Sequence, residues 1–284
     1  MLEKLPNDTT LFVLSDDSKV FSELYSNTRL KLVPIYSVLR NNSEFSENVE
    51  ISQIDQSGNS VSSLLCPNNP KLEPIIKADF ETLAESSQIA GIQMTNLEMP
   101  LNLSNLGCFC PYCLALAEKR SIDLQAISIQ FTKKSNNGLS LRWIQKEFPD
   151  WLKFRMDSVS NLAGRLMIAI RKYNPDIFLG LNVNFSEIPA FFGQDYFFLA
   201  LFLDNLNFIV NGNSHLEEKR FLKQIRSVTK GFLGDIKLFL QMKVPYEYNL
   251  NKISKFITRL KKFSFDGLIF QVSTINELNP VIMM

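Results

Sequence analysis

Short, largely apolar runs recur along this chain of 284 residues and alternate with segments whose apolar residues have helical spacing. An apolar run without polar alternation is typical of a parallel strand that is covered on both faces. We expect strands at residues 11–14, 31–37, 91–95, 177–183, 208–211, 237–244 and 267–272. Because strands that alternate with helices predict a parallel sheet with helices outside it, the pattern indicates an α/β fold.

Helical spacing is clearest in residues 70–87 and in residues 150–173. We expect Asp150 to cap the second of these helices and the Asn-Pro pair at 174–175 to end it. Shorter helices are expected at residues 15–25, 114–119, 196–203, 217–228 and 251–263. The segment 121–137 follows neither pattern clearly enough to be assigned.

The order of these elements predicts a (β/α)8-type TIM barrel formed by residues 1–284 as a single domain. Because only seven strands are clear, either an early strand is missing or disguised in the sequence, or the barrel is degenerate. An open doubly wound sheet is the alternative, although the sequence contains no glycine-rich phosphate loop of the kind that such folds use. A small hairpin, turned at Ser57-Gly58, is expected within the polar region around residues 51–61. The 23 phenylalanines predict an aromatic core.

Charge and hydropathy exclude several kinds of partner. The chain has 30 Lys+Arg against 29 Asp+Glu, so no broad electrostatic surface for nucleic acid or an acidic membrane is expected. It has no apolar run of about 18 residues that could span a membrane, and its first ten residues do not resemble a secretory signal. We therefore expect a cytoplasmic protein without nucleic-acid or membrane partners, which could form a homo-oligomer.

All four cysteines of the chain fall in one pattern, in which Cys66 is followed by Cys108, Cys110 and Cys113 in a C-x-C-x-x-C arrangement. In a cytosolic protein such a pattern favours a metal site over disulfides. Four thiolates suit Zn²⁺ in tetrahedral coordination and leave no position for water, so the predicted zinc is structural. The alternative is a set of free, partly buried thiols. The single histidine, His215, is expected at the surface.

Three segments of the sequence are distinctive: CPNNP at residues 66–70, CFCPYC at residues 108–113 and W-x-x-F-R-x-D at residues 151–157. Together they resemble the sequence of glycoside hydrolase family 42, the beta-galactosidase family; the first two are specific, and the third is similar as well. The resemblance covers roughly residues 62–273. It implies a TIM-barrel domain with a four-cysteine zinc site and a hydrolase that acts on the O-glycosyl bonds of a carbohydrate.

The chain departs from this family at both catalytic positions. Where the resemblance implies an Asn-Glu pair after the fourth strand, the sequence has Asn96-Leu97-Glu98, so the glutamate is displaced by one residue. Where it implies a nucleophilic glutamate at the end of the seventh strand, the sequence has Lys243, and the next carboxylate is Glu247. We expect Glu98 as the acid/base and Glu247 as the second carboxylate, because glycoside hydrolysis needs a pair of carboxyl groups.

Polar side chains at the other strand ends are candidates for substrate binding, because the working face of a TIM barrel lies where its strands end. They are Asn96, Asn182, Asn184, Asn211, Gln241, Lys243, Tyr246 and Gln271. Asp204 and Asp266 precede strands and are expected at the opposite, structural end. Two alternatives to an active hydrolase are a catalytically inactive barrel that binds a carbohydrate or an anionic small molecule, and a scaffold or assembly barrel.

Overall fold

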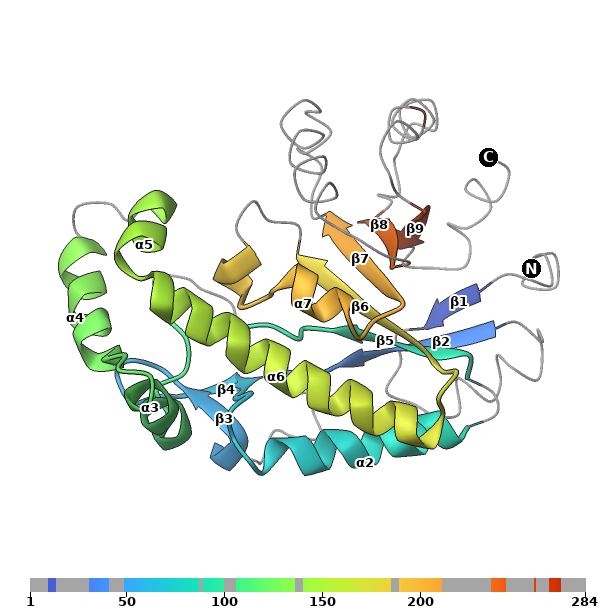
Figure 1. Cartoon of the computed structure of the whole chain (residues 1–284), viewed down its shortest axis with the longest axis horizontal. Coiled ribbons are helices and arrows are strands. Elements are labelled where there is room, and N and C mark those ends of the chain that lie inside the picture. The colour runs from blue at the N-terminus through green and yellow to red at the C-terminus, as the bar shows by residue number, and fades with distance from the viewer. Residues whose placement is uncertain are drawn as a thin grey trace.

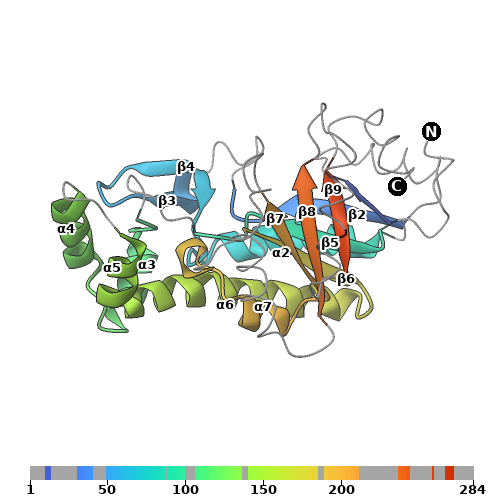
Figure 2. The same ribbon diagram turned by 90° about the horizontal axis from the view of Figure 1, so that it is seen from above.

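A computed structural model describes residues 10–13, 31–40, 49–86, 89–99, 106–135, 140–184, 189–210, 236–243, 258 and 266–271. Within these residues, a curled parallel sheet is covered on its outer side by helices (Figures 1 and 2). None of the described helices combines the length and the apolar character that crossing a bilayer would require.

The seven strands of this sheet lie side by side in the order in which they occur in the chain. They are β1 (Thr10–Val13), β2 (Lys31–Ser37), β5 (Gly91–Thr95), β6 (Phe178–Asn184), β7 (Asn205–Val210), β8 (Lys237–Lys243) and β9 (Gly267–Gln271). Every neighbouring pair is parallel. A doubly wound sheet reverses its strand order at a switch point, whereas a TIM barrel does not. All seven predicted strands are present, although β7 begins at Asn205, three residues before its predicted start. The described part of the sheet is an incomplete barrel in which no pairing joins β9 to β1.

Two long helices, α2 (Leu72–Glu85) and α6 (Pro149–Tyr173), lie side by side against the outer side of the sheet (Figure 1). Both were predicted from their helical spacing. The predicted cap of α6 is wrong: Phe148 is the N-cap, and Asp150 lies within the first turn. Pro149 takes the first helical position because its fixed φ and missing N–H suit that place, which moves the N-cap two residues earlier, from Asp150 to Phe148.

Three further helices extend beyond the sheet at one end of α6 (Figures 1 and 2). They are α3 (Pro111–Glu118), α4 (Leu124–Ser135), which occupies the segment left unassigned, and α5 (Leu141–Glu147). Aromatic contacts join α4, α5 and α6: the Phe131 ring lies 5.6, 5.2 and 5.3 Å from the rings of Trp143, Phe148 and Trp151. Edge-on and tilted ring contacts of this kind bury large apolar area, as the phenylalanine content predicted.

The segment between β6 and β7 contains a 3-10 turn, η4 (Pro189–Phe192), and the short helix α7 (Tyr196–Ala200), which Asp195 caps through Phe197 N and Phe198 N. The predicted helices at 15–25 and 217–228 lie outside the described residues, as does the one at 251–263 apart from Thr258.

The predicted hairpin is present between β2 and α2. It consists of a 3-10 turn, η3 (Val49–Ile51), followed by the antiparallel strands β3 (Ser52–Ile54) and β4 (Ser60–Leu65). Gly58, in the turn, has a φ of 85°, a conformation that glycine adopts without strain. The hairpin matters for function because β4 ends directly before Cys66.

Two aspartates hold the amino-terminal edge of the sheet. Asp204 Oδ2 accepts the backbone N–H of Leu179 at 2.7 Å, and the N–H of Asp204 donates to the Leu179 carbonyl at 2.8 Å. Asp266 makes the same pair of bonds to Leu238, at 2.7 and 2.8 Å. Both carboxylates therefore lie at the structural end, where they were expected.

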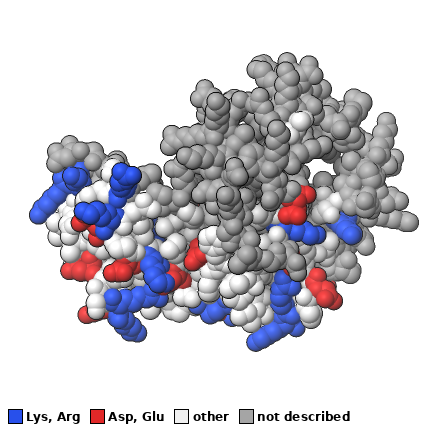
Figure 3. Space-filling model, turned by 45° about the horizontal axis from the view of Figure 1, so that its top comes forward, with Lys and Arg blue, Asp and Glu red and all other residues white. Residues whose placement is uncertain are grey.

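On the described surface that Figure 3 shows, basic and acidic side chains are intermingled, and neither sign forms a continuous patch. This distribution agrees with the balanced composition of the chain.

Candidate metal centre and barrel mouth

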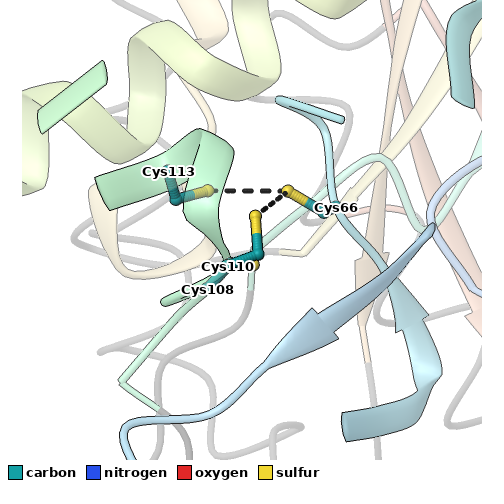
Figure 4. Close-up of side chains that lie close together, drawn as sticks. All are labelled: Cys66, Cys108, Cys110 and Cys113. Atoms are coloured by element: carbon teal, nitrogen blue, oxygen red, sulfur yellow. Dashed lines mark hydrogen bonds between the residues drawn. The ribbon is translucent and has the colours of Figure 1, made fainter. Parts of the chain in front are cut away.

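The four cysteines converge on one point, although Cys66 lies more than forty positions from the others in the sequence. Their sulfur atoms all lie within 4.8 Å of one another, and Cys66 Sγ is 3.5 Å from both Cys110 Sγ and Cys113 Sγ (Figure 4). All four side chains are buried. Four sulfurs bound tetrahedrally to Zn²⁺ at about 2.3 Å would be about 3.8 Å apart, so the observed cluster fits a zinc site in donor type, number and spacing.

Local backbone structure explains how each cysteine reaches this point. Cys66 follows β4, and its N–H donates to the Ile51 carbonyl at 2.9 Å. Cys110 is the N-cap of α3, with Pro111 at the first helical position, and Cys113 lies within the first turn. The cluster thus joins a hairpin to the start of a helix.

Residues 106–110, which we call the cysteine loop, are also tied to the hairpin through their backbone. The N–H of Phe109 donates to the Ile54 carbonyl at 2.7 Å, and the N–H of Ile54 donates to Cys108 Sγ at 3.5 Å. A backbone N–H that donates to a sulfur stabilises its thiolate form, as metal binding requires.

The CPNNP segment supports the cluster from a second direction. Asn68 Nδ2 lies 3.2 Å from Cys113 Sγ and 3.0 Å from Ser158 Oγ on α6. The buried Asn69 donates to the Glu50 carbonyl at 2.8 Å and accepts the N–H of Lys71 at 3.0 Å, just before α2 begins. Both asparagines of the motif, Asn68 and Asn69, therefore have a structural role.

The thiols perturb one another strongly. Hydrogen bonds from Cys108, and then from the other cysteines, hold the pKa of the Cys110 thiol far below its usual value. The hydrogen bond with Cys108 is also the largest cause that raises the pKa of Cys66 and of Cys113, and burial adds to it. Without a cation these shifts favour the thiolate of Cys110 and the neutral thiols of Cys66 and Cys113, whereas a divalent metal would compensate the charge of several thiolates.

The segment after β5 carries Glu98 into the interior. Glu98 is only 6% exposed, and Leu97 and Met99 beside it are buried as well. The N–H of Met99 donates to the Phe192 carbonyl at 2.8 Å, and Gln194 Nε2 donates to the Leu97 carbonyl at 3.1 Å. The segment 97–99, which we call the Glu98 loop, is therefore fixed against η4 and the residues that follow it.

Asn96 interrupts the strand just before this loop. Its φ of 53° lies in the left-handed region, where asparagine is tolerated better than most residues. Because this conformation ends the alternation of the strand, the direction of the Glu98 side chain does not follow from its position relative to Asn96. Asn96 Nδ2 donates to Ser37 Oγ at 3.0 Å, next to the end of β2.

Amide side chains form a buried row across four adjacent strands, which we call the amide belt: Gln93 on β5, Asn182 on β6, Asn207 on β7 and Gln241 on β8. The amides of Gln93 and Asn182 are hydrogen-bonded at 2.8 Å. Asn207 Nδ2 donates to Asn182 Oδ1 at 2.7 Å and to Gln241 Oε1 at 2.5 Å. The interior of a TIM barrel is usually filled by branched apolar side chains, so a polar row is unusual there.

Comparison with known proteins identifies the fold. The scan against protein-family models found no match, and neither did the search of curated proteins. Among solved structures, the catalytic domain of a beta-amylase from Paenibacillus polymyxa matches with a TM-score of 0.62 and 15% identity, over 95% of this chain and 85% of that one. Two beta-galactosidases, from Bacillus circulans sp. alkalophilus and G. stearothermophilus, each match with a TM-score of 0.62 and 14% identity over 95% of this chain.

The chain has a glycoside-hydrolase-like TIM-barrel fold. The second beta-galactosidase is a member of family 42, the family that the cysteine motifs resemble. The chain spans 47% of the length of each of these two beta-galactosidases. At identities this low, the comparison identifies the fold and says nothing of the reaction.

Within this barrel, the structure brings some of the predicted site residues together. Asn182 and Gln241 both contact Asn207 in the amide belt, while Asn96 and Glu98 lie on the segment that follows β5. The backbones of Asn184, Lys243 and Gln271 end their strands, and Lys243 is in register with Gln271. Glu247, Asn211 and Tyr246 lie outside the described residues.

Three polar residues of the barrel interior were missed by sequence analysis: Gln93, Asn205 and Asn207, each of them buried. The available signal for Gln93 was a lone amide inside an otherwise apolar strand, whereas Asn205 and Asn207 lie before residue 208, where their strand was predicted to begin. Gly180 belongs to the same arrangement, because a Cβ added there would lie 2.0 Å from both Asn205 Oδ1 and Gln93 Oε1. The absence of a side chain at position 180 makes room for the amides of two neighbouring strands.

Proposed function

We propose that the chain is a zinc-clamped glycoside hydrolase-like barrel, similar to family 42, that acts on a carbohydrate at the carboxyl ends of its strands. The observation that carries the proposal is a buried glutamate, Glu98, which follows β5 in a fold shared with beta-amylase and beta-galactosidases. Residues 1–284 act as a single domain in this proposal.

Glu98 would serve as the acid/base and Glu247 as the second carboxylate. In such a pair, the protonated carboxyl group donates its proton to the glycosidic oxygen while the other acts as nucleophile or activates water. A carboxyl separation of about 5–5.5 Å corresponds to retention at the anomeric carbon, and about 6.5–9.5 Å to inversion. Asn96, Asn184 and Gln271, at strand ends, would hydrogen-bond sugar hydroxyls.

Zinc would be held by Cys66, Cys108, Cys110 and Cys113, whose spacing and burial fit it. Four thiolates leave a zinc ion no open position, so the metal supplies no chemistry to the substrate. Its role is to clamp the hairpin to the loop that follows β5, which also carries Glu98.

Hydrolysis of a panel of aryl glycosides and oligosaccharides tests the proposed activity. Turnover by the zinc-loaded wild type should be lost in Glu98→Gln and in Glu247→Gln, because each change removes an ionisable carboxyl group and preserves its size. Glu147→Gln, at an exposed position on α5, is the matched control and should retain wild-type activity. Undiminished turnover in both site variants would refute the assignment.

A second function, carbohydrate binding without hydrolysis, is favoured by one observation. The last residue of β8 is Lys243, in register with Gln271 on β9, at the place where the resemblance to family 42 implies a glutamate. A lysine at a strand end suits an anionic sugar, such as a uronic acid or a sugar phosphate.

Calorimetric titration with matched neutral and anionic oligosaccharides separates the two functions. Binding of the anionic member without turnover, weakened in Lys243→Met, would support the binding protein. Turnover that requires Glu98 would support the hydrolase instead.

A further inference from the structure

The side chain of Arg155, in the middle of α6, is only 1% exposed. Its guanidinium group donates to three backbone carbonyls of the described residues: Nη1 to Leu106 at 2.9 Å, and Nη2 to Phe191 at 3.1 Å and to Met99. The guanidinium carbon also lies 4.9 Å from the centre of the Trp151 ring, one turn earlier on the helix. A buried cation needs such hydrogen bonds, because isolating its charge from water is very unfavourable.

The three carbonyl acceptors belong to three different segments. Met99 is the residue after Glu98, Leu106 lies two residues before Cys108, and Phe191 is part of η4. The N–H of Met99 donates to the Phe192 carbonyl at 2.8 Å, so two of these segments are also bonded to each other. One guanidinium therefore sets the positions of the Glu98 loop and of the cysteine loop together.

Gly107 makes room for this arrangement. Its φ is +114°, and a Cβ at this position would lie 3.0 Å from Arg155 Nη1. The backbone next to Cys108 is thus shaped around the guanidinium. One turn along the same helix, Ser158 contacts Asn68, which in turn contacts Cys113 Sγ. Helix α6 is therefore linked to the cysteine cluster by two indirect contacts, one through Leu106 and one through Asn68.

We propose that Arg155 is a positioning residue that couples metal binding at the four cysteines to the placement of the Glu98 loop. Metal binding fixes the backbone from Leu106 to Cys108, this backbone holds the guanidinium, and the guanidinium holds the Met99 carbonyl beside Glu98. The assignment of Glu98 as a catalytic residue rests on the proposed function, whereas the coupling between the two loops does not. Burial lowers the pKa of Arg155 to about 9, which leaves it charged at neutral pH.

Hydrogen–deuterium exchange on the full chain, zinc-loaded and after removal of zinc by a chelator, measures this coupling directly. Two N–H groups report on the two loops: Phe109, which donates to Ile54, and Met99, which donates to Phe192. In the wild type, zinc removal should raise exchange in both loops, by on the order of 10-fold for the Glu98 loop, a typical coupling between sites. In Arg155→Met the change should be confined to the cysteine loop.

Arg165→Met is the matched control, because this arginine lies on the same helix but forms an exposed ion pair with Glu73. It should keep the wild-type response in both loops. If Arg155→Met does not fold, Arg155→Lys and Gly107→Ala replace it, since the first keeps the charge with fewer donors and the second displaces the guanidinium. Both should weaken the response of the Glu98 loop.

The proposal is overturned if zinc removal in the wild type changes exchange in the cysteine loop alone, or if the variants at positions 155 and 107 leave the response of the Glu98 loop intact. The exchange measurements need no substrate, so their outcome is independent of the hydrolase assay. If hydrolysis is observed, Arg155→Lys should lower kcat with little change in KM or zinc content, because the misplaced group acts in the reaction rather than in binding. If the wild type shows the exchange coupling but no hydrolase activity, and Arg155→Met loses the coupling, the proposed function is refuted and this inference stays in place.

Discussion

The cysteine cluster and the amide belt are both buried polar groupings, but they are built in opposite ways. The four cysteines come from two loops and meet at one point, with every sulfur within 4.8 Å of the others. The amide belt takes one residue from each of four neighbouring strands and extends across the sheet through pairwise hydrogen bonds. The thiolates of a cluster need a cation to balance their charge, whereas neutral amides hydrogen-bond one another and need none.

The two regions also differ in how completely their buried polar atoms are hydrogen-bonded. Among the described residues, Asn205 Nδ2 and Asn207 Oδ1 are buried without a hydrogen-bond partner in the interior of the sheet. A buried polar atom without a partner is destabilising by about 1–3 kcal/mol. The belt is therefore expected to contribute less to stability than a metal-loaded cluster, and the following substitutions test that order.

Cys110→Ser should have the largest effect. Removing one of four thiolates abolishes tight zinc binding, and the loss of a structural metal should destabilise the fold by on the order of 5 kcal/mol at saturating zinc, lowering Tm by about 10 °C or more. Metal analysis, which should find about one zinc per wild-type chain, and thermal unfolding provide the measurements. Ala115→Ser, exposed on the same helix, controls for the new hydroxyl group and should change neither quantity. A variant with full metal content and wild-type Tm would remove the distinction between cluster and belt.

Gly180→Ala should have the next largest effect. The added Cβ would lie 2.0 Å from the side chains of Asn205 and Gln93, so the amides must shift, at a cost of about 1–3 kcal/mol in the free energy of unfolding. Gly164→Ala on α6 is the contrast, because a Cβ there meets Phe202 at an ordinary 3.6 Å and alanine favours the helix by about 0.5–1 kcal/mol. Urea unfolding of both variants measures the pair. If Gly180→Ala and Gly164→Ala are equally stable, the amides of Asn205 and Gln93 are not held as tightly as described.

Asn68→Ala should weaken zinc binding without abolishing it. The asparagine donates to Cys113 Sγ from outside the ligand set, and loss of such a contact typically reduces metal affinity about 10–100-fold. Competition with a chromogenic chelator gives the affinity. Ser158→Ala, which removes only the partner of Asn68 on α6, should reduce the affinity less. The reverse order of the two effects would contradict the role given to Asn68.

Glu73→Gln, on the outer surface, should have the smallest effect of the four substitutions. It provides a baseline for the other three variants. Partial burial raises the pKa of the Glu73 carboxyl, but hydrogen bonds and charges from Lys77 and Arg165 outweigh it, so this pKa lies below its ordinary value of 4.5. A lowered pKa in the folded state means that the ion pairs stabilise the protein above about pH 4.5 and lose that effect as the pH falls through the folded-state pKa. The variant should be destabilised by less than about 1 kcal/mol at pH 7 and should approach the wild type in acid. A difference that persists at pH 2 would assign the effect to packing.

The cysteine site could be predicted because its four ligands lie in two short, recognisable segments of the sequence. Three ligands lie within six residues and the fourth opens a distinctive CPNNP segment, so spacing alone indicated the set. The strands and the two long helices were equally legible from periodicity. The N-cap of α6 was misplaced by two residues because Asp150 and Pro149 both favour a helix start, and only the backbone shows which residue takes which position.

The barrel interior and Arg155 could not be predicted from the sequence in the same way. Neighbouring members of the amide belt lie between 25 and 89 positions apart along the chain, and only the strand register brings them together. Arg155 was visible as a lone cation on the apolar stripe of a predicted helix, which signals a special partner. Its acceptors are backbone carbonyls, which leave no trace in side-chain identity.

The paired bonds of Asp204 and Asp266 have a consequence for how the molecule can vary. Each aspartate is bonded to both backbone groups of one residue on the neighbouring strand, so sliding β7 along β6, or β9 along β8, by two residues would break both bonds at once. Alignment of the strands is thereby held at the end of the sheet away from Glu98 and Lys243. Substitutions at the opposite rim can change what the barrel recognises without changing which residues face one another inside it.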